Sequence, residues 1–139
     1  MTILFFIFNY KTSLPQNTPE TIADSFFFYF QTKNIEYAIK YIFSTNKYLL
    51  HSHEIINTIK QKFEKALPIL GKYHRYELYL KKTITPNLVQ LGYLMIFDRQ
   101  PIKITFLLYK PKEKWQVQDM KFDDKIDDIL EETKNKISY

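Results

Sequence analysis

Asp119, His74 and Asp98 are the residues whose types suit acid–base chemistry within the strands that this sequence predicts. A carboxylate that faces an apolar pocket has a raised pKa and is able to remove a proton from a substrate. Asp119 alternates with Trp115 and Val117, and strand alternation would turn its side chain inward with theirs. The acid–base hypothesis therefore takes Asp119 as its first catalytic base, with His74 as the other candidate.

Each of these residues also has a simpler interpretation. Asp98 precedes Pro101 in a turn, where a solvated carboxylate that caps the turn is the stronger reading. Asp119 and Lys121 together would form one exposed face. His74 fits a partly buried histidine that bonds a backbone carbonyl better than it fits a pocket base. Because no base–acid pair stands at a recognisable spacing, catalysis is the alternative rather than the preferred function.

Metal and cofactor sites are not supported by the sequence. His51 and His53 flank Ser52, but no third ligand follows at the spacing of a metal site. The chain has 0 Cys, which excludes thiolate metal sites, disulfides and a cysteine nucleophile. With only 2 Gly it has no glycine-rich phosphate loop either. We therefore expect no metal and no cofactor.

The charge balance argues against a nucleic-acid partner. The formal net charge is +5, from 20 basic and 15 acidic residues. Nearly all the basic residues are Lys, scattered among acids, whereas Arg is the usual reader of base edges. The apolar run at residues 1–10 is shorter than the roughly 20 residues that cross a bilayer. We expect no nucleic acid and no integral membrane segment.

Residues 1–17 have two interpretations, and the sequence leaves both open. They are either the remnant of a signal peptide, with an apolar core but no basic leading segment, or an N-terminal arm packed on the domain. Export is slightly favoured over a cytoplasmic location, because nothing polar alternates within the apolar run. Residues 18–139 form a single domain, of ordinary size for a chain with 45% apolar residues.

Hydrophobic periodicity predicts helices first and strands afterwards. Helical spacing covers residues 19–33, 35–43 and 53–67, and Pro68 should kink or end the third helix. Four antiparallel strands follow at residues 73–83, 88–97, 102–109 and 115–122. A last helix should begin at Asp123 and Asp124. The core residues that we expect to be largely buried are Phe26, Phe30, Ile59, Phe63, Tyr93, Ile104 and Phe106.

Over residues 18–122 this order of elements resembles the nuclear transport factor 2-like superfamily, also called cystatin-like. The resemblance rests on the aromatic first helix, the entry to the second helix at residues 33–38 and the passage into the sheet at residues 70–73. The last piece is a tyrosine, a polar hairpin tip and a tryptophan, at residues 109–115. The C-terminal helix is additional to the minimal family pattern.

The resemblance implies an α+β fold in which the N-terminal helices pack in the concave face of a strongly curved four-stranded antiparallel sheet. Such a cone has a pocket at its wide end. The lining residues would be Phe27, Tyr76, Tyr93, Phe106 and Trp115. The preferred function is a non-catalytic module that binds a small apolar ligand in the cone or forms a homodimer through the outer face of the sheet. The alternatives are an enzyme of the ketosteroid-isomerase or dehydratase kind, and a secreted accessory protein whose cone is filled by its Phe residues.

Overall fold

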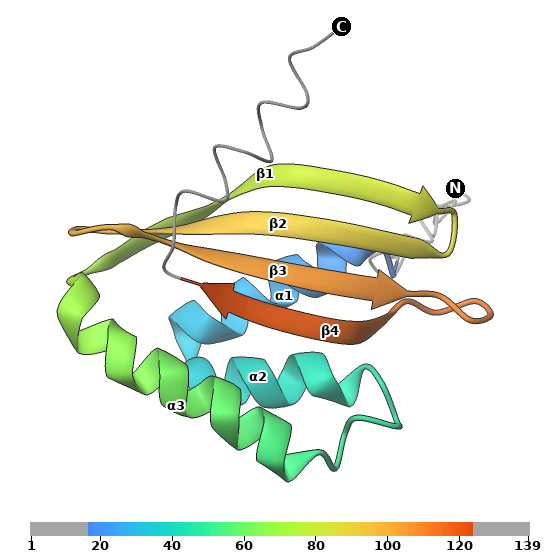
Figure 1. Cartoon of the computed structure of the whole chain (residues 1–139), viewed down its shortest axis with the longest axis horizontal. Coiled ribbons are helices and arrows are strands. Elements are labelled where there is room, and N and C mark those ends of the chain that lie inside the picture. The colour runs from blue at the N-terminus through green and yellow to red at the C-terminus, as the bar shows by residue number, and fades with distance from the viewer. Residues whose placement is uncertain (1–16, 124–139) are drawn as a thin grey trace, which may run out of the picture.

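The computed structural model describes residues 17–123, and within them three helices precede a four-stranded antiparallel sheet. The fold is therefore α+β, and the sheet is curved and open, with the strand order β1-β2-β3-β4 (Figure 1). The elements are α1 (Pro19–Thr32), α2 (Ile35–Ser44), α3 (His53–Leu70), β1 (Tyr73–Thr85), β2 (Leu88–Phe97), β3 (Pro101–Tyr109) and β4 (Gln116–Asp123). Every predicted helix and strand within these residues is confirmed, with small differences at the ends.

The first two helices begin at residues that cap them. The backbone N–H of Thr21 donates to Thr18 Oγ1 at 3.1 Å, and the N–H of Thr18 donates to Thr21 Oγ1 at 2.9 Å. This reciprocal pair satisfies two backbone donors that an uncapped helix would leave open. The Asn34 side chain accepts a 2.8 Å hydrogen bond from the N–H of Tyr37 and starts α2 in the same way.

The third helix is longer than predicted, because α3 continues through Pro68 to Leu70. Of the two effects expected of Pro68, a kink or an end of the helix, the end is therefore wrong. Gly71 ends it instead, with a φ of 78° that disfavours any residue with a Cβ. A Cβ at Gly71 would also lie 2.9 Å from Asp98 Cβ, so the β2–β3 turn packs directly on this glycine.

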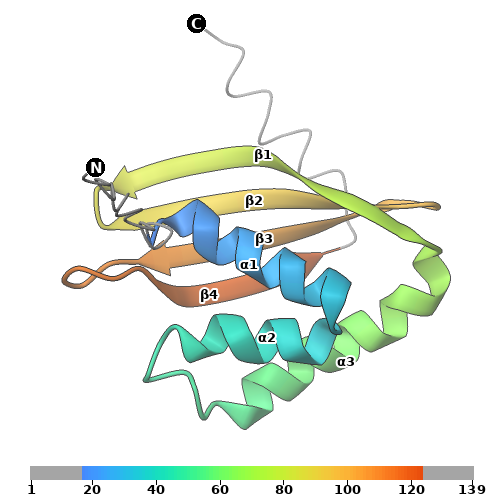
Figure 2. The same cartoon turned by 180° about the vertical axis from the view of Figure 1, so that it is seen from behind.

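The core lies between the helices and one face of the sheet. Figure 2 shows α1 lying across this face, with α2 and α3 beside it toward the β4 edge. The α1 residues Phe26 and Phe27 are buried, and the Phe26 ring lies 5.3 Å from the ring of Phe106 on β3. Of the expected core residues, Phe26, Phe63, Tyr93, Ile104 and Phe106 are buried, and Phe30 and Ile59 are partly buried.

Bulges in β1 change which side chains face the core. Leu78 pairs with Tyr93 and Leu80 with Gly92, so Tyr79 is an extra residue between them. Tyr93 and Gly92 are neighbours on β2 and therefore point to opposite faces of the sheet. Their partners Leu78 and Leu80 lie on opposite faces for the same reason. The alternation of side chains along β1 is therefore reversed beyond Tyr79.

Two predictions fall outside the described residues. These are the assignment of residues 1–17 to a signal peptide or an arm, of which the structure describes only Asn17, and the helix beginning at Asp123 and Asp124. Within residues 17–123, no helix is both long enough and apolar enough to cross a membrane.

Candidate functional site

Four of the five predicted pocket residues come together as one aromatic cluster. Phe27 stacks on Tyr76 with a centroid separation of 4.1 Å and lies 5.1 Å from Tyr93 and 6.1 Å from Phe106. One ring comes from α1 and the others from β1, β2 and β3 in turn. Phe27, Tyr93 and Phe106 are buried, so these rings pack against one another in the interior. We call Phe27, Tyr76, Tyr93 and Phe106 the ring cluster.

The fifth predicted pocket residue, Trp115, lies just before β4. Its side chain is 9% exposed, and the Lys110 ammonium group lies 5.2 Å from the centre of its ring. The backbone N–H of Trp115 donates a 2.8 Å hydrogen bond to Asn17. Trp115 thus packs beside the β3–β4 hairpin, and its ring has a cation–π contact there.

A polar rim borders the ring cluster where α1 meets β1. The hydroxyl of Tyr76 donates a 2.9 Å hydrogen bond to Asp24, and Glu20 forms an ion pair with Lys81. Glu20, Asp24 and Phe27 follow one another at helical steps of four and three, which places them on one face of α1. This spacing was the available sequence signal, and neither acid was among the predicted site residues.

The rim and the burial together favour neutral tyrosines. Burial raises the pKa of Tyr76 to about 12, and the hydrogen bond to Asp24 and its negative charge act in the same direction. Burial also raises the pKa of Tyr93, with further contributions from the charges of Asp24 and Glu20. Both hydroxyls are therefore proton donors at neutral pH, suited to hydrogen bonding rather than to proton abstraction.

Asp119 lies on the face of the sheet that points away from the ring cluster. It pairs with Leu107, whereas Val117 pairs with the buried Leu108, and Gln118 is the extra residue between them. The Asp119 carboxylate is half exposed and lies 3.9 Å from the Lys121 ammonium group. The expectation that Asp119 points into the cone is therefore wrong, because a bulge turns it outward.

His74, the other candidate for a pocket base, does not point toward the ring cluster either. It is the extra residue between Tyr73 and Arg75 in the pairing of β1 with β2. Its Nε2 lies 2.5 Å from the carboxylate of Asp98, and both side chains are exposed. The hydrogen bond to His74, with a second one from the N–H of Lys72, lowers the pKa of Asp98. His74 and the N–H of Lys72 thus tie the start of β1 to Asp98 in the β2–β3 turn.

The described histidines and acids do not form a metal centre. The rings of His51 and His53 lie 6.3 Å apart at the start of α3. Residues 17–123 contain no group of three or more His, Asp or Glu side chains that could hold a metal ion.

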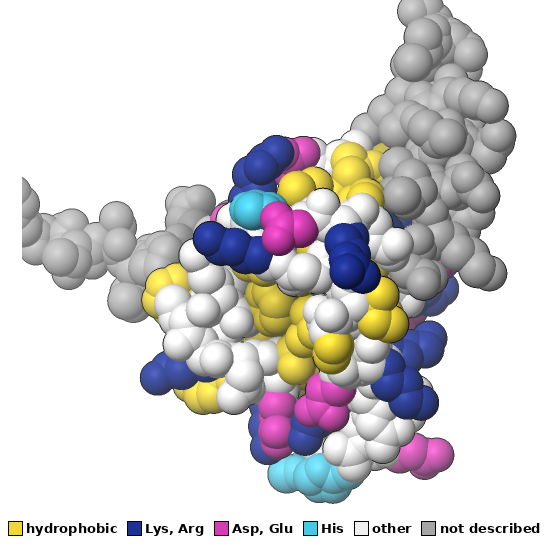
Figure 3. Space-filling view, turned by 90° about the vertical axis from the view of Figure 1, so that its left-hand side faces the viewer, with side chains coloured by type: hydrophobic (Ala, Val, Ile, Leu, Met, Phe, Trp, Pro, Cys, Tyr) yellow, Lys and Arg dark blue, Asp and Glu magenta, His cyan; other side chains and the backbone are white. Residues whose placement is uncertain are grey.

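Two of the hollows over the described residues lie where the β3–β4 hairpin and the end of β4 meet the helical layer. One, of about 640 Å³, lies between the α2–α3 connection and the β3–β4 hairpin, and is lined by Lys47, Tyr48, Pro111, Lys112, Glu113, Lys114 and Gln116. The other, of about 360 Å³, lies between α3 and the end of β4, and is lined by Lys62, Lys65, Ala66, Ile69, Phe122 and Asp123. Figure 3 looks at the end of the molecule where α3 and β4 end, and shows exposed apolar side chains among charged ones. Neither hollow is lined by the ring cluster.

No family model, curated protein or solved structure matches this chain. The resemblance to the nuclear transport factor 2-like superfamily therefore rests on the order of the elements and on the residues quoted for it.

Proposed function

We propose that this chain is a non-catalytic protein-interaction module of the nuclear transport factor 2-like kind. In this proposal the sheet curves around the helices as a cone, and its outer face pairs with a second copy of the chain. The single observation that carries the proposal is the set of partly exposed aliphatic side chains on this outer face. The ring cluster on the opposite face supports it too, because side chains already occupy the interior where an apolar ligand would bind.

The register of the strands defines the outer face. Leu94 and Ile96 on β2 alternate with the buried Tyr93 and Met95, so they point away from the core. Leu107 alternates in the same way on β3. The aliphatic residues of this face are Leu80, Leu88, Leu94, Ile96 and Leu107, all partly exposed. The polar side chains of Gln90 and Lys103 share this face, opposite Leu107 and Leu94 in the register. Exposed apolar side chains on a sheet face are typical of an interaction surface.

Charged side chains flank these aliphatic residues on the two outer strands. On β1, Arg75 lies 2.8 Å from Glu77, and on β4, Lys121 lies 3.9 Å from Asp119. An apolar centre with a charged rim is the usual anatomy of a protein–protein interface. In a two-fold pair each patch meets its own copy, and a rim with both signs offers opposite charges to that copy.

The proposal leaves proton abstraction aside. Asp119 faces solvent, and His74 is engaged with Asp98. Asp24, which borders the ring cluster, is exposed and accepts its hydrogen bond from Tyr76 at the surface. This arrangement favours binding over acid–base catalysis.

Sedimentation velocity on the full chain tests the proposal. We expect a dimer that dissociates in Leu94→Glu and in Leu107→Glu, because each buries a carboxylate at the centre of the interface. Ile69→Glu is the matched control, since Ile69 lies on α3 and is 63% exposed. This variant should remain a dimer. A wild-type chain that stays monomeric at high concentration would overturn the proposal, as would dissociation by Ile69→Glu to the same extent. Circular dichroism establishes that all three variants are folded.

A further inference from the structure

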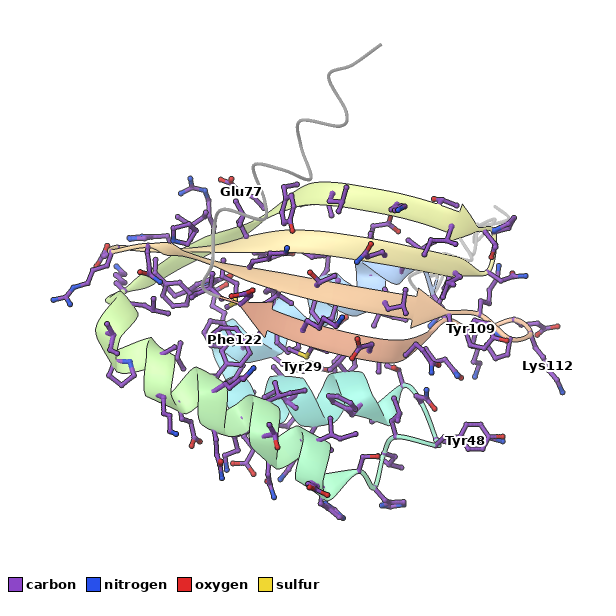
Figure 4. The ribbon with its side chains drawn as sticks, in the orientation of Figure 1. Tyr29, Tyr48, Glu77, Tyr109, Lys112 and Phe122 are labelled. Atoms are coloured by element: carbon purple, nitrogen blue, oxygen red, sulfur yellow. The ribbon has the colours of Figure 1, made fainter. Side chains whose placement is uncertain are left out.

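The hollow of about 640 Å³ between the α2–α3 connection and the β3–β4 hairpin has the dimensions of a small-molecule site. We call it the hairpin groove. Lys47 and Tyr48 form one wall, residues 111–114 form the other, and Gln116 completes the lining. Figure 4 shows that Tyr48 and Lys112, from these two walls, project at the same end of the molecule.

The walls of the hairpin groove are held together by hydrogen bonds that span more than 70 residues of sequence. Asn46 is 2% exposed, and its Nδ2 donates to the carbonyl oxygen of Val117 at 2.8 Å. The Oδ1 of the same side chain accepts from the N–H of Tyr48 at 3.0 Å. The hydroxyl of Thr45 accepts a 2.9 Å hydrogen bond from the N–H of Val117. The backbone that carries Lys47 and Tyr48 is thus fixed against β4 before any ligand arrives, which lowers the entropy cost of binding.

The groove is positively charged. Three of its lining side chains are Lys47, Lys112 and Lys114, against the single acid Glu113. Within residues 17–123 no carboxylate lies within ion-pair distance of any of these three lysines. Their ammonium groups are therefore available to neutralise an anion, and as compact point charges they suit phosphate.

The groove also offers a flat ring. The Tyr48 side chain is 78% exposed, although an aromatic side chain of this size normally finds cover. The Lys47 ammonium group lies 5.1 Å from the centre of the Tyr48 ring, so charge and ring face the same space. An exposed tyrosine beside lysines is a surface on which a planar, negatively charged ligand is able to stack.

We propose that the hairpin groove binds a small phosphate-bearing ligand with a planar ring, of the nucleoside phosphate class. In this arrangement Lys47, Lys112 and Lys114 neutralise the phosphates, and Tyr48 stacks on the ring. Asn46 and Thr45 are positioning residues that hold the Tyr48 wall against β4. The inference uses neither the ring cluster nor the aliphatic outer face, and it is independent of the proposed dimer.

Titration of the full-length protein with ADP, followed by amide NMR shifts, tests the proposal. We expect saturable shifts at Lys47, Tyr48, Lys110 and residues 112–116. Pyrophosphate and adenosine, which carry the charge and the ring separately, should each bind at least about tenfold more weakly, since stacking on an aromatic ring contributes about 1–3 kcal/mol. The proposal is overturned if ADP causes no saturable shift at millimolar concentration, or if pyrophosphate binds as tightly as ADP.

Variants separate a specific groove from general attraction of anions. Tyr48→Ala and the double variant Lys112→Glu with Lys114→Glu should each weaken ADP binding about tenfold or more. The matched control replaces Lys62 and Lys65 by Glu, because these two lysines line the smaller hollow at α3. It should leave ADP binding unchanged, and an equal loss in the control would overturn the proposal. A single-stranded oligonucleotide that binds through the same residues much more tightly than ADP would overturn the small-ligand class.

Discussion

The hydroxyl of Tyr76 on β1 donates a 2.9 Å hydrogen bond to the carboxylate of Asp24 on α1, and so ties the edge strand to the first helix. The charge of Asp24 favours the protonated phenol and adds to the effect of burial on the Tyr76 pKa, which is about 12. We expect Asp24→Asn to lower this pKa, since it removes the charge. The pKa should remain above the ordinary value of about 10, because burial, the larger cause, persists. The ring-carbon shift of Tyr76, followed by NMR across the alkaline range, measures the change.

The raised pKa of Tyr76 also gives stability a defined dependence on pH. The stability that Tyr76 contributes is fully present below its ordinary pKa of about 10 and is lost as pH rises through about 12. Asp24→Asn should reduce this loss. Asp98→Asn is the control, because Asp98 bonds His74 and not Tyr76. A Tyr76 pKa that fell equally in both variants would show that the contact with Asp24 is not its cause.

The order and type of the elements were predictable from the sequence because hydrophobic periodicity and capping residues are local signals. Thr18, Asn34 and Gly71, which are residue types that favour helix ends, stand at helix ends in the structure. The strands β2 and β3 were also predicted correctly. They pair with each other in an uninterrupted register, so the alternation in their sequences matches the faces of the sheet. Local chemistry and tertiary packing therefore agree over most of residues 17–123.

The candidate site was harder to predict, and the errors share one physical cause. His74, Tyr79 and Gln118 are extra residues in their strand pairs, and each reverses the alternation of side chains beyond it. For this reason Asp119 faces outward, although strict alternation with Val117 would place it inside. A bulge depends on how two strands pair, and nothing local in these stretches marks it. Four of the residues expected to line a pocket do lie together, in the ring cluster, since their choice depended on bulk and polarity rather than on one register.

Asn46 was missed for a different reason. It is the one polar residue that is buried among residues 17–123. In the sequence it stands in a Ser-Thr-Asn stretch that is typical of an exposed turn. The carbonyl group to which its side chain donates belongs to Val117 on β4, 71 residues away. Only the tertiary structure brings these groups to Asn46 and makes its burial favourable.

Phe63→Ala should lower the free energy of unfolding by about 3–5 kcal/mol, which is the usual cost of truncating a large buried aromatic side chain. The Phe63 ring on α3 is fully buried, and its centre lies 4.1 Å from that of the Phe122 ring on β4. Its truncation would leave a cavity between the third helix and the last strand. Urea denaturation of the two proteins measures the difference.

Phe28→Ala is the matched control for Phe63→Ala. Phe28 is also a helical phenylalanine, but its side chain is 59% exposed. We expect a change within about 0.5 kcal/mol, as for most surface substitutions. A loss below about 1 kcal/mol for Phe63→Ala would contradict the packing of α3 on β4.

Asn46→Ala should cost about 1–3 kcal/mol, because it leaves the Val117 carbonyl and the Tyr48 N–H without the partners that Asn46 provides. Asn57→Ala, at an exposed position on α3, is the matched control and should change stability by less than about 0.5 kcal/mol.

Asn46→Asp gives a second test of the same contacts, since a carboxylate keeps an acceptor for Tyr48 but sets a negative charge against the Val117 carbonyl. Burial would raise the pKa of this new carboxyl group above its unfolded value of about 3.9. Its stability relative to the wild type should therefore be highest below that pH and fall as pH rises through the folded pKa. Urea denaturation at several pH values measures this slope, and an Asn46→Asp protein whose stability difference from the wild type is independent of pH would contradict the burial of Asn46 against β4.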